Sequence, residues 1–142
     1  MKLLSDGFQH NELMDKKFSY RGGNISPHLK WENIPSETKS LAISCNDPDA
    51  PVGDWIHWLV HNISANTTEI PQGGPVPGVE VKNDYGKVGY GGPAPPSGTH
   101  RYIFRIYALD IENLEGITKN NFISKVKEHT LESAEIIGLY KA

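Results

Sequence analysis

Short segments in which apolar and polar residues alternate, separated by loops rich in glycine and proline, restrict the fold of this chain more than any other feature. Alternation with a period of two places successive side chains on opposite faces of a β-strand. The chain also carries 14 glycines and 10 prolines, which favour turns over long helices. The sequence therefore predicts a mostly β fold, a large antiparallel β-sheet or sandwich-like structure with one or two small peripheral helices.

Four segments are predicted to be strands and one to be a helix. The predicted strands are residues 40–47, 55–63, 100–109 and 134–141, and a helix is a close alternative for the last of them. The predicted helix covers residues 121–131, where Phe122 and Val126 keep helical spacing and Thr118 or Asn120 could form the N-cap. Loops dense in glycine and proline are expected at residues 22–27, 47–54, 71–78 and 86–98.

Length and charge restrict the class of protein. A chain of 142 residues without a linker or a repeat is expected to form one domain, residues 1–142. The formal net charge is −3 and basic residues form no stripe, so nucleic acid is not an expected partner. No apolar run approaches the roughly 20 residues of a membrane span, and a signal-peptide core is not expected at the start. The one cysteine, Cys45, cannot form an internal disulfide, so a cytoplasmic location is expected.

Three titratable residues lie on otherwise apolar strand faces: Asp47, His57 and His100. If both histidine-bearing strands pair antiparallel with the strand that ends at Asp47, both histidines come to that end of the sheet. A carboxylate and two imidazoles at one apolar rim shift one another's proton affinity, as in many functional sites. The alternative is that each histidine is a core residue bonded to a backbone carbonyl. His61 is expected on the same face as His57, further into the core and with a structural role.

Two loops adjoin this rim. Residues 47–51, with the sequence Asp-Pro-Asp-Ala-Pro, form a stiff turn because each proline fixes φ, and they add a second carboxylate, Asp49. The bond between Ala50 and Pro51 is a candidate cis peptide. Residues 89–99 are rich in glycine, which lets backbone amides approach a ligand, although a plain long connection is the alternative.

Several kinds of chemistry could use these residues. A metal site would recruit the carboxylates and imidazoles of this region, Asp47, Asp49, His57 and His100. No metal-binding spacing supports such a site, and Ser97 does not lie in the G-x-S-x-G motif of an acyl-transfer nucleophile. The glycines match neither a P-loop nor a dinucleotide-binding pattern. The remaining option is a small anion pocket, in which imidazole N–H groups, the hydroxyl of Tyr90 or Tyr102 and glycine amides bind phosphate-like oxygens without a cofactor or metal.

Several motifs together resemble a known family. Residues 47–51, 55–60 and 91–102 resemble the motifs of the phosphatidylethanolamine-binding protein family, and more closely those of its short prokaryotic branch, the Raf kinase inhibitor-like proteins. Residues 24–31 resemble the N-terminal motif of that branch, and residues 135–140 resemble its ending. The resemblance therefore covers nearly the whole chain, and the two central motifs are highly specific in this order and separation.

The resemblance implies a large antiparallel β fold with small peripheral helices and one shallow anion pocket. The family's pocket residues correspond to Asp47, Asp49, Pro51, Trp55, His57, Pro96, His100 and Tyr102 of this chain. Gly92 of the glycine-rich loop is a further candidate ligand contact. Members of the family bind phosphate, phosphorylethanolamine and similar anions, some regulate kinases, and some inhibit serine proteases. Prokaryotic members often form homodimers, so a homodimer is a further expectation.

The sequence departs from the family pattern at three positions. Arg21 stands where the prokaryotic branch usually has an acid, and Ser64 stands where a proline is expected. Ala94 stands where a cysteine is common, which removes a possible thiol beside the pocket. The C-terminal helix that borders the pocket in animal members has no obvious counterpart, which argues against large phospholipids as natural ligands.

The leading functional hypothesis is a non-enzymatic binding protein for small phosphorylated or carboxylated anions, with a possible regulatory role. The alternative is a protein inhibitor of a kinase or a serine protease. A third reading is a metal-assisted hydrolase that uses Asp47, His57 and His100. Two tryptophans are assigned different roles: Trp58 is expected in the core, and Trp55 is expected to form a wall of the pocket.

Overall fold

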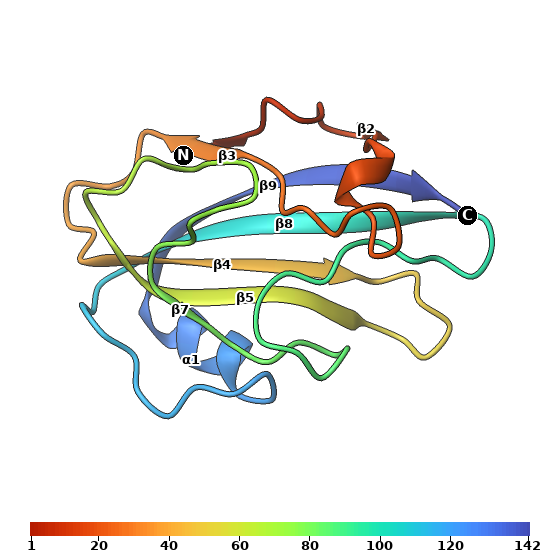
Figure 1. Ribbon diagram of the computed structural model, residues 1–142. Coiled ribbons are helices and arrows are strands. Elements are labelled where there is room, and N and C mark those ends of the chain that lie inside the picture. Colours follow the sequence, from red (N-terminus) through yellow and green to blue (C-terminus); the bar gives the residue numbers. More distant parts are fainter.

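Two β-sheets and one short α-helix make up the fold in the computed structural model, which describes residues 1–142 (Figure 1). In chain order the elements are β1 (Lys2–Leu4), β2 (Glu12–Leu13), the 3-10 helix η1 (Lys16–Phe18), β3 (Leu29–Glu32), β4 (Ser40–Asp47), β5 (Trp55–Ser64), β6 (Glu69–Ile70), β7 (Val79–Glu80), β8 (Thr99–Leu109), α1 (Phe122–His129) and β9 (Thr130–Lys141). The mostly β fold predicted from the sequence is confirmed.

The larger sheet has six strands in the order β2-β9-β8-β4-β5-β7. Strand β4 lies between β5 and β8 and pairs antiparallel with both. The carboxyl end of β4 therefore lies beside the amino ends of its two neighbours, and Asp47 pairs directly with Trp55. This arrangement confirms the pairing on which the predicted meeting of Asp47 with both histidines depends.

The four predicted strands are all present, and the helical alternative for the last is wrong. Strand β9 pairs antiparallel with β8 from Thr130 to Lys141, with one irregularity near Thr130, so this segment is an extended strand. Helix α1 is shorter than expected and begins after Asn121, because β9 starts immediately at its carboxyl end. Neither predicted residue caps the helix; instead the Asn121 side chain accepts a hydrogen bond from the Thr118 amide at 2.8 Å.

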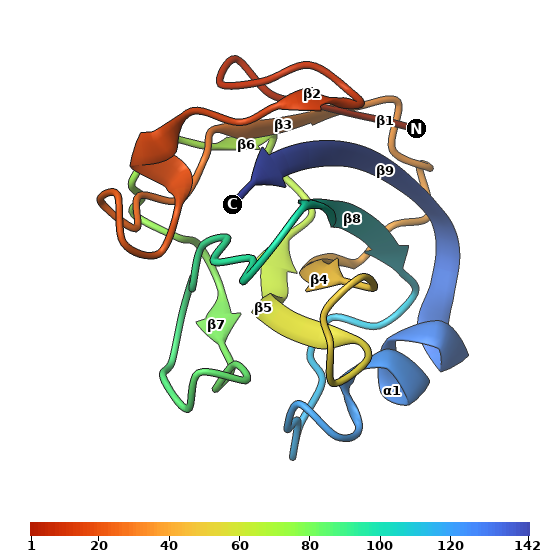
Figure 2. The same ribbon diagram turned by 90° about the vertical axis from the view of Figure 1, so that its right-hand side faces the viewer.

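The small sheet and helix α1 lie on opposite faces of the six-stranded sheet (Figure 2), and each covers a hydrophobic core. On one face the small sheet β1-β3-β6 covers a core that includes Leu29, Trp31 and Trp58. On the other face α1 packs against the sheet through Phe122 and Val126. Strand β4 lies between the two cores and gives alternate residues to them, Leu41 to the first and Ala42 to the second.

Five short strands were not predicted from the sequence: β1, β2, β3, β6 and β7. They have only two to four residues each, and alternation over such a short length is not distinctive. The candidate cis bond between Ala50 and Pro51 is not cis; the cis peptide of this structure joins Gly74 to Pro75.

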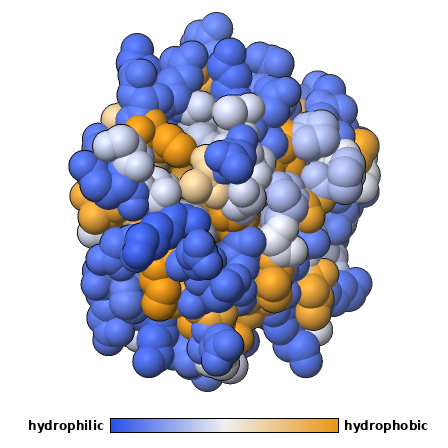
Figure 3. All heavy atoms as spheres, turned by 90° about the vertical axis from the view of Figure 1, so that its left-hand side faces the viewer, coloured by the Kyte–Doolittle hydropathy of each residue, from blue (hydrophilic) through white to orange (hydrophobic).

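The two ends of the large sheet differ in character. At one end, near the C-terminus, the loops that follow β4 and precede β8 face the viewer of Figure 2. At the opposite end, hydrophobic side chains appear on the surface as small spots between hydrophilic ones (Figure 3). None of the helices has the length and hydrophobicity that would let it cross a membrane.

Candidate functional site

A pocket of about 230 Å³ lies where the carboxyl end of β4 meets the amino ends of β5 and β8. It is lined by seven of the nine residues predicted from the sequence: Asp47, Pro51, Trp55, His57, Pro96, His100 and Tyr102. Trp58 is fully buried in the core while Trp55 lines the pocket, as predicted. Asp49 and Gly92 lie outside the lining.

A β-bulge places His57 in the pocket. In the pairing of β4 with β5, Cys45 lies opposite Trp58 and Asn46 lies opposite Ile56, so His57 has no partner across the ladder. The bulge breaks strict alternation, and His57 and Trp58 therefore both belong to the side of the sheet that carries the pocket. The prediction that His57 and His61 share a face is wrong for this reason, since His61 lines a different cavity.

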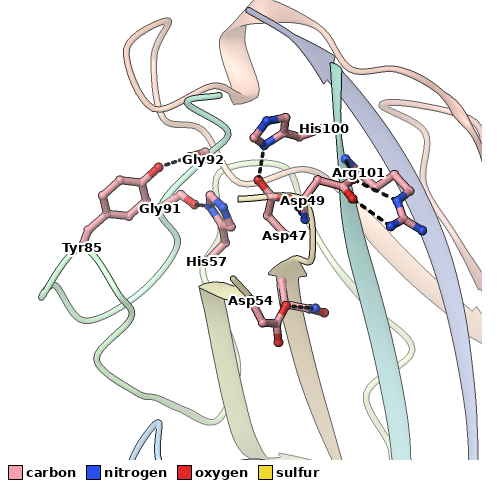
Figure 4. A network of polar contacts seen from close by, with 10 residues as sticks. Asp47, Asp49, Asp54, His57, Tyr85, Gly91, Gly92, His100 and Arg101 are labelled. Carbon is pink, nitrogen blue, oxygen red and sulfur yellow. Dashed lines mark hydrogen bonds and ion pairs between the residues drawn. The ribbon is translucent and has the colours of Figure 1, made fainter. Parts of the chain in front are cut away.

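The central polar contact of the pocket joins Asp47 to His100 (Figure 4). Nδ1 of His100 donates to Oδ2 of Asp47 at 2.7 Å, and both side chains are buried. The other carboxylate oxygen, Oδ1, accepts the backbone amide of Asp49 at 2.7 Å. Both carboxylate oxygens of Asp47 therefore accept hydrogen bonds. The hydrogen bond to Oδ2 holds the His100 ring with its proton on Nδ1, and Nε2 takes no part in this contact.

His57 is held by the glycine-rich loop. Its Nδ1 donates to the carbonyl of Gly91 at 2.6 Å, and the Gly91 amide donates to the His57 carbonyl at 2.9 Å. Burial lowers the pKa of His57, while the carbonyl of Gly91 and the charge of Asp47 oppose that shift. His57 is therefore neutral near pH 7, with the proton on Nδ1 and the lone pair on Nε2.

Tyr102 brings an unpartnered hydroxyl to the pocket. The residue is 1% exposed, and its hydroxyl oxygen is buried without a hydrogen-bond partner. Burial and the nearby carboxylate of Asp47, which lies outside hydrogen-bonding geometry, raise the pKa of Tyr102, so the hydroxyl keeps its proton. The ring packs edge-on against His57, with the ring centres 5.1 Å apart. Buried hydroxyls are normally bonded, so this one is a candidate contact for a ligand.

Tyr85 forms a wall of the pocket that the sequence did not indicate. Its hydroxyl donates to the Gly92 carbonyl at 2.7 Å, and its ring stacks on Tyr20 with the ring centres 4.1 Å apart. Burial raises the pKa of Tyr85 to about 12. Tyr85 lies in a loop without periodicity, so only the tertiary structure reveals its place.

Asp49 acts outside the pocket as a clamp between two loops (Figure 4). Its carboxylate accepts two hydrogen bonds from the Arg101 guanidinium, at 2.9 and 2.8 Å, and one from the Arg101 amide at 3.0 Å. The hydrogen bond from the Arg101 side chain lowers the pKa of Asp49 to about 2. This clamp ties the turn after β4 to the start of β8, where His100 lies.

The amides of Gly91 and Gly92 in the glycine-rich loop are not free for a ligand, which corrects the expectation from the sequence for these two residues. The Gly92 amide donates to the Asn24 side chain at 2.8 Å, and the Gly91 amide is bonded to His57. A Cβ atom on Gly92 would lie 2.0 Å from the Phe18 carbonyl oxygen, so glycine is needed there for close packing. The Tyr90 hydroxyl is also engaged, because it donates to the Phe18 carbonyl at 2.7 Å.

The residues proposed above as metal ligands do not converge on one point, because the Asp49 carboxylate faces Arg101. Across the structure, the side chains of histidine, cysteine, aspartate and glutamate form no group of three or more that could hold a metal ion.

Comparison with known proteins places the chain in a family. Residues 4–141 match the family model described as phosphatidylethanolamine-binding protein. A UPF0098 protein from Methanothermobacter thermautotrophicus is 42% identical and the UPF0098 protein YbhB from Escherichia coli is 41% identical; each match covers 99% of both chains.

Two crystal structures have closely similar folds. The structure of a phosphatidylethanolamine-binding protein homologue from Chlamydia trachomatis has a TM-score of 0.92 and 36% identity, over 99% of this chain and 97% of that one. Escherichia coli YbcL, described as a member of the mammalian family, has a TM-score of 0.94 and 31% identity, over 99% of this chain and 98% of that one. The family match and these relatives agree with the motifs around the pocket: the chain belongs to the phosphatidylethanolamine-binding protein family, in its short prokaryotic branch.

Proposed function

We propose that the pocket binds the phosphate group of a small phosphomonoester, such as phosphorylethanolamine, and that the protein acts as a binding protein rather than an enzyme. The observation that carries this proposal is the buried, unpartnered hydroxyl of Tyr102 beside His57 and His100. Both imidazoles are held through Nδ1, so their Nε2 atoms are the positions left for a ligand. A phosphate offers several acceptor oxygens to the Tyr102 hydroxyl and to these Nε2 atoms when they carry a proton.

Charge makes this binding dependent on protons. The lining includes the carboxylate of Asp47 and no lysine or arginine, so an anion gains no attraction while both imidazoles are neutral. A proton on Nε2 of His57 or His100 turns that atom into a donor and adds a positive charge. The affinity for phosphate should therefore increase as the pH falls towards 5.

The lining supports a binding role. It contains no serine, threonine, cysteine or lysine that could serve as an activated nucleophile beside a histidine. The volume of about 230 Å³ suits a small polar headgroup rather than acyl chains. The mouth is apolar, with exposed Val52 and with Pro95 and Pro96, so few polar contacts remain and an affinity in the millimolar to micromolar range is expected.

Titration of phosphorylethanolamine, with inorganic phosphate in parallel and detection by NMR, tests this proposal. Shift changes should cluster at residues of the pocket, and Tyr102→Phe should weaken binding about tenfold by removing one hydrogen bond to a charged group. Tyr107→Phe is the matched control, because Tyr107 lies on the same strand and its hydroxyl is bonded to Ser44 on the other face of the sheet. Equal affinities in the two variants, or no binding at about 50 mM ligand, would refute the assignment.

A further inference from the structure

A second cavity, of about 450 Å³, lies beside the core that packs α1 against the large sheet. Its walls come from β5, from β7 and the two residues after it, and from the loop that leads into α1. None of its lining residues belongs to the phosphate pocket. The cavity is therefore a separate place where a ligand could bind.

His61 is the buried polar residue of this cavity. Its residue exposure is 5%, and its Nδ1 atom is buried without a hydrogen-bond partner. A second β-bulge sets its position, because Leu41 pairs with Ile63 and Ile43 with Val60 across the ladder. A histidine that is built into a strand at this depth would normally be bonded to a protein group.

The orphaned Nδ1 determines which nitrogen carries the proton. We assign the lone pair to Nδ1 and the proton to Nε2, because a buried N–H without a partner is rarer in proteins than a buried acceptor without one. Nε2 has no protein partner either, but it is not among the buried unpartnered atoms and thus keeps access to the cavity. In this tautomer His61 offers an N–H donor to a ligand.

The other polar groups of the cavity are also mainly donors. The Thr118 hydroxyl makes no hydrogen bond within the protein, and exposed Lys82 forms no ion pair. Lys119 is bonded to Asp84 at 2.8 Å, which neutralises its charge. The one carboxylate of the lining, Glu80, accepts the indole N–H of Trp58 at 2.9 Å and is thus already engaged.

The apolar part of the lining suggests the rest of the ligand. Val79, Val81 and Ile117 line the same cavity, and Val79 is 47% exposed. A ligand that satisfies both parts carries an acceptor group at one end and a short hydrocarbon chain at the other. The loop that completes the cavity is fixed next to His61, because the side chain of Asn62 accepts the Leu114 amide at 2.8 Å and donates to its carbonyl at 3.2 Å.

We propose that this cavity is a second ligand site, which binds a small aliphatic monocarboxylate. The carboxylate accepts hydrogen bonds from Nε2 of His61 and from the hydroxyl of Thr118, with the charge of Lys82 at the rim. The hydrocarbon chain lies against Val79 and Val81.

Titration with isobutyrate, followed through the histidine imidazole ¹⁵N signals and the methyl signals, tests this site. Saturable shifts at His61 and at the methyl groups of Val81 and Ile117 are expected, with a millimolar dissociation constant. Thr118→Val, which keeps the shape and removes the hydroxyl, should raise the dissociation constant about fivefold. Lys87→Gln is the matched control for Lys82→Gln, because Lys87 is an exposed lysine outside the cavity.

Three results would overturn the proposal. The first is an absence of shifts at His61 with about 100 mM isobutyrate, a concentration well above the millimolar range. The second is an unchanged dissociation constant in both Thr118→Val and Lys82→Gln. The third is tighter binding of inorganic phosphate than of isobutyrate at His61, which would exclude a role for the apolar wall. Because no residue is shared with the phosphate pocket, failure of either site leaves the test of the other unaffected.

Discussion

Removal of one hydroxyl group from each of two tyrosines on β8 should change the stability of the protein in opposite directions. The Tyr102 hydroxyl is buried without a partner in the folded state, whereas water solvates it in the unfolded state. An unsatisfied buried polar group costs about 1–3 kcal/mol. Tyr102→Phe should therefore raise the free energy of unfolding by about 1 kcal/mol, at the low end of that range because the ring packing stays the same.

Tyr107→Phe provides the comparison. The Tyr107 hydroxyl is bonded to Ser44 Oγ at 3.0 Å, and both residues are buried. Its loss leaves the Ser44 hydroxyl without this partner and should lower the free energy of unfolding by about 1 kcal/mol. The two variants should thus differ by about 2 kcal/mol although the chemical change is identical.

Urea unfolding without phosphate, followed by tryptophan fluorescence, measures both values in one assay. Calorimetry should show the same order, with Tyr102→Phe melting a few degrees above the natural protein. If Tyr102→Phe is destabilised as much as Tyr107→Phe, its hydroxyl has a partner in the folded protein, and the reasoning that makes it a ligand contact is refuted. Adding phosphorylethanolamine should stabilise the natural protein more than Tyr102→Phe, since binding to the folded state adds to its stability.

Three further predictions follow from the same contacts. Trp58 is fully buried, so Trp58→Ala should lower the free energy of unfolding in urea by about 3–5 kcal/mol. Trp55→Ala should lower it by about 1 kcal/mol or less and mainly weaken ligand binding, because Trp55 lines the pocket. Equal losses of stability would contradict this division of roles. The contact with Arg101 lowers the pKa of Asp49 to about 2. The stabilising effect of this contact should therefore be complete above pH 4 and disappear between about pH 4 and 2. Acid-unfolding curves of Asp49→Asn should lack this pH dependence. Burial lowers the pKa of His57 below 6.5, so the stabilising contribution of neutral His57 is present above pH 6.5 and is lost as the pH falls. The free energy of unfolding, measured without ligand from pH 7.5 to 5, should show this decrease. The decrease should be smaller in His57→Gln.

Local sequence pattern was sufficient for the strands that form the site. Alternation in residues 40–47 and 100–109 identified β4 and β8, and placed Asp47 and His100 on one apolar face. Antiparallel pairing then brought the two side chains within 2.7 Å. These features depend on a period of two, which a single sequence displays directly.

Other features depend on contacts between distant segments and could not be predicted in the same way. The bulge at His57 shifts the register by one residue, and nothing in the local sequence indicates that shift. Tyr85 reaches the pocket because its loop is anchored by Asn83, whose side chain accepts the amides of Tyr85 and Lys87. The amide of Gly92 was expected to face a ligand, but it is bonded to Asn24, which lies 68 residues away in the sequence.

The central claim is that phosphate binding requires a proton on the pocket histidines, and proton uptake during binding tests it most directly. Phosphorylethanolamine should be titrated calorimetrically at pH 7 in two buffers with different ionisation enthalpies. A heat of binding that changes with the buffer in the direction of net proton uptake is the predicted result, and uptake should fall in His57→Gln. Binding with no net uptake of protons, or with the same uptake in His57→Gln and His100→Gln as in the natural protein, would contradict the account.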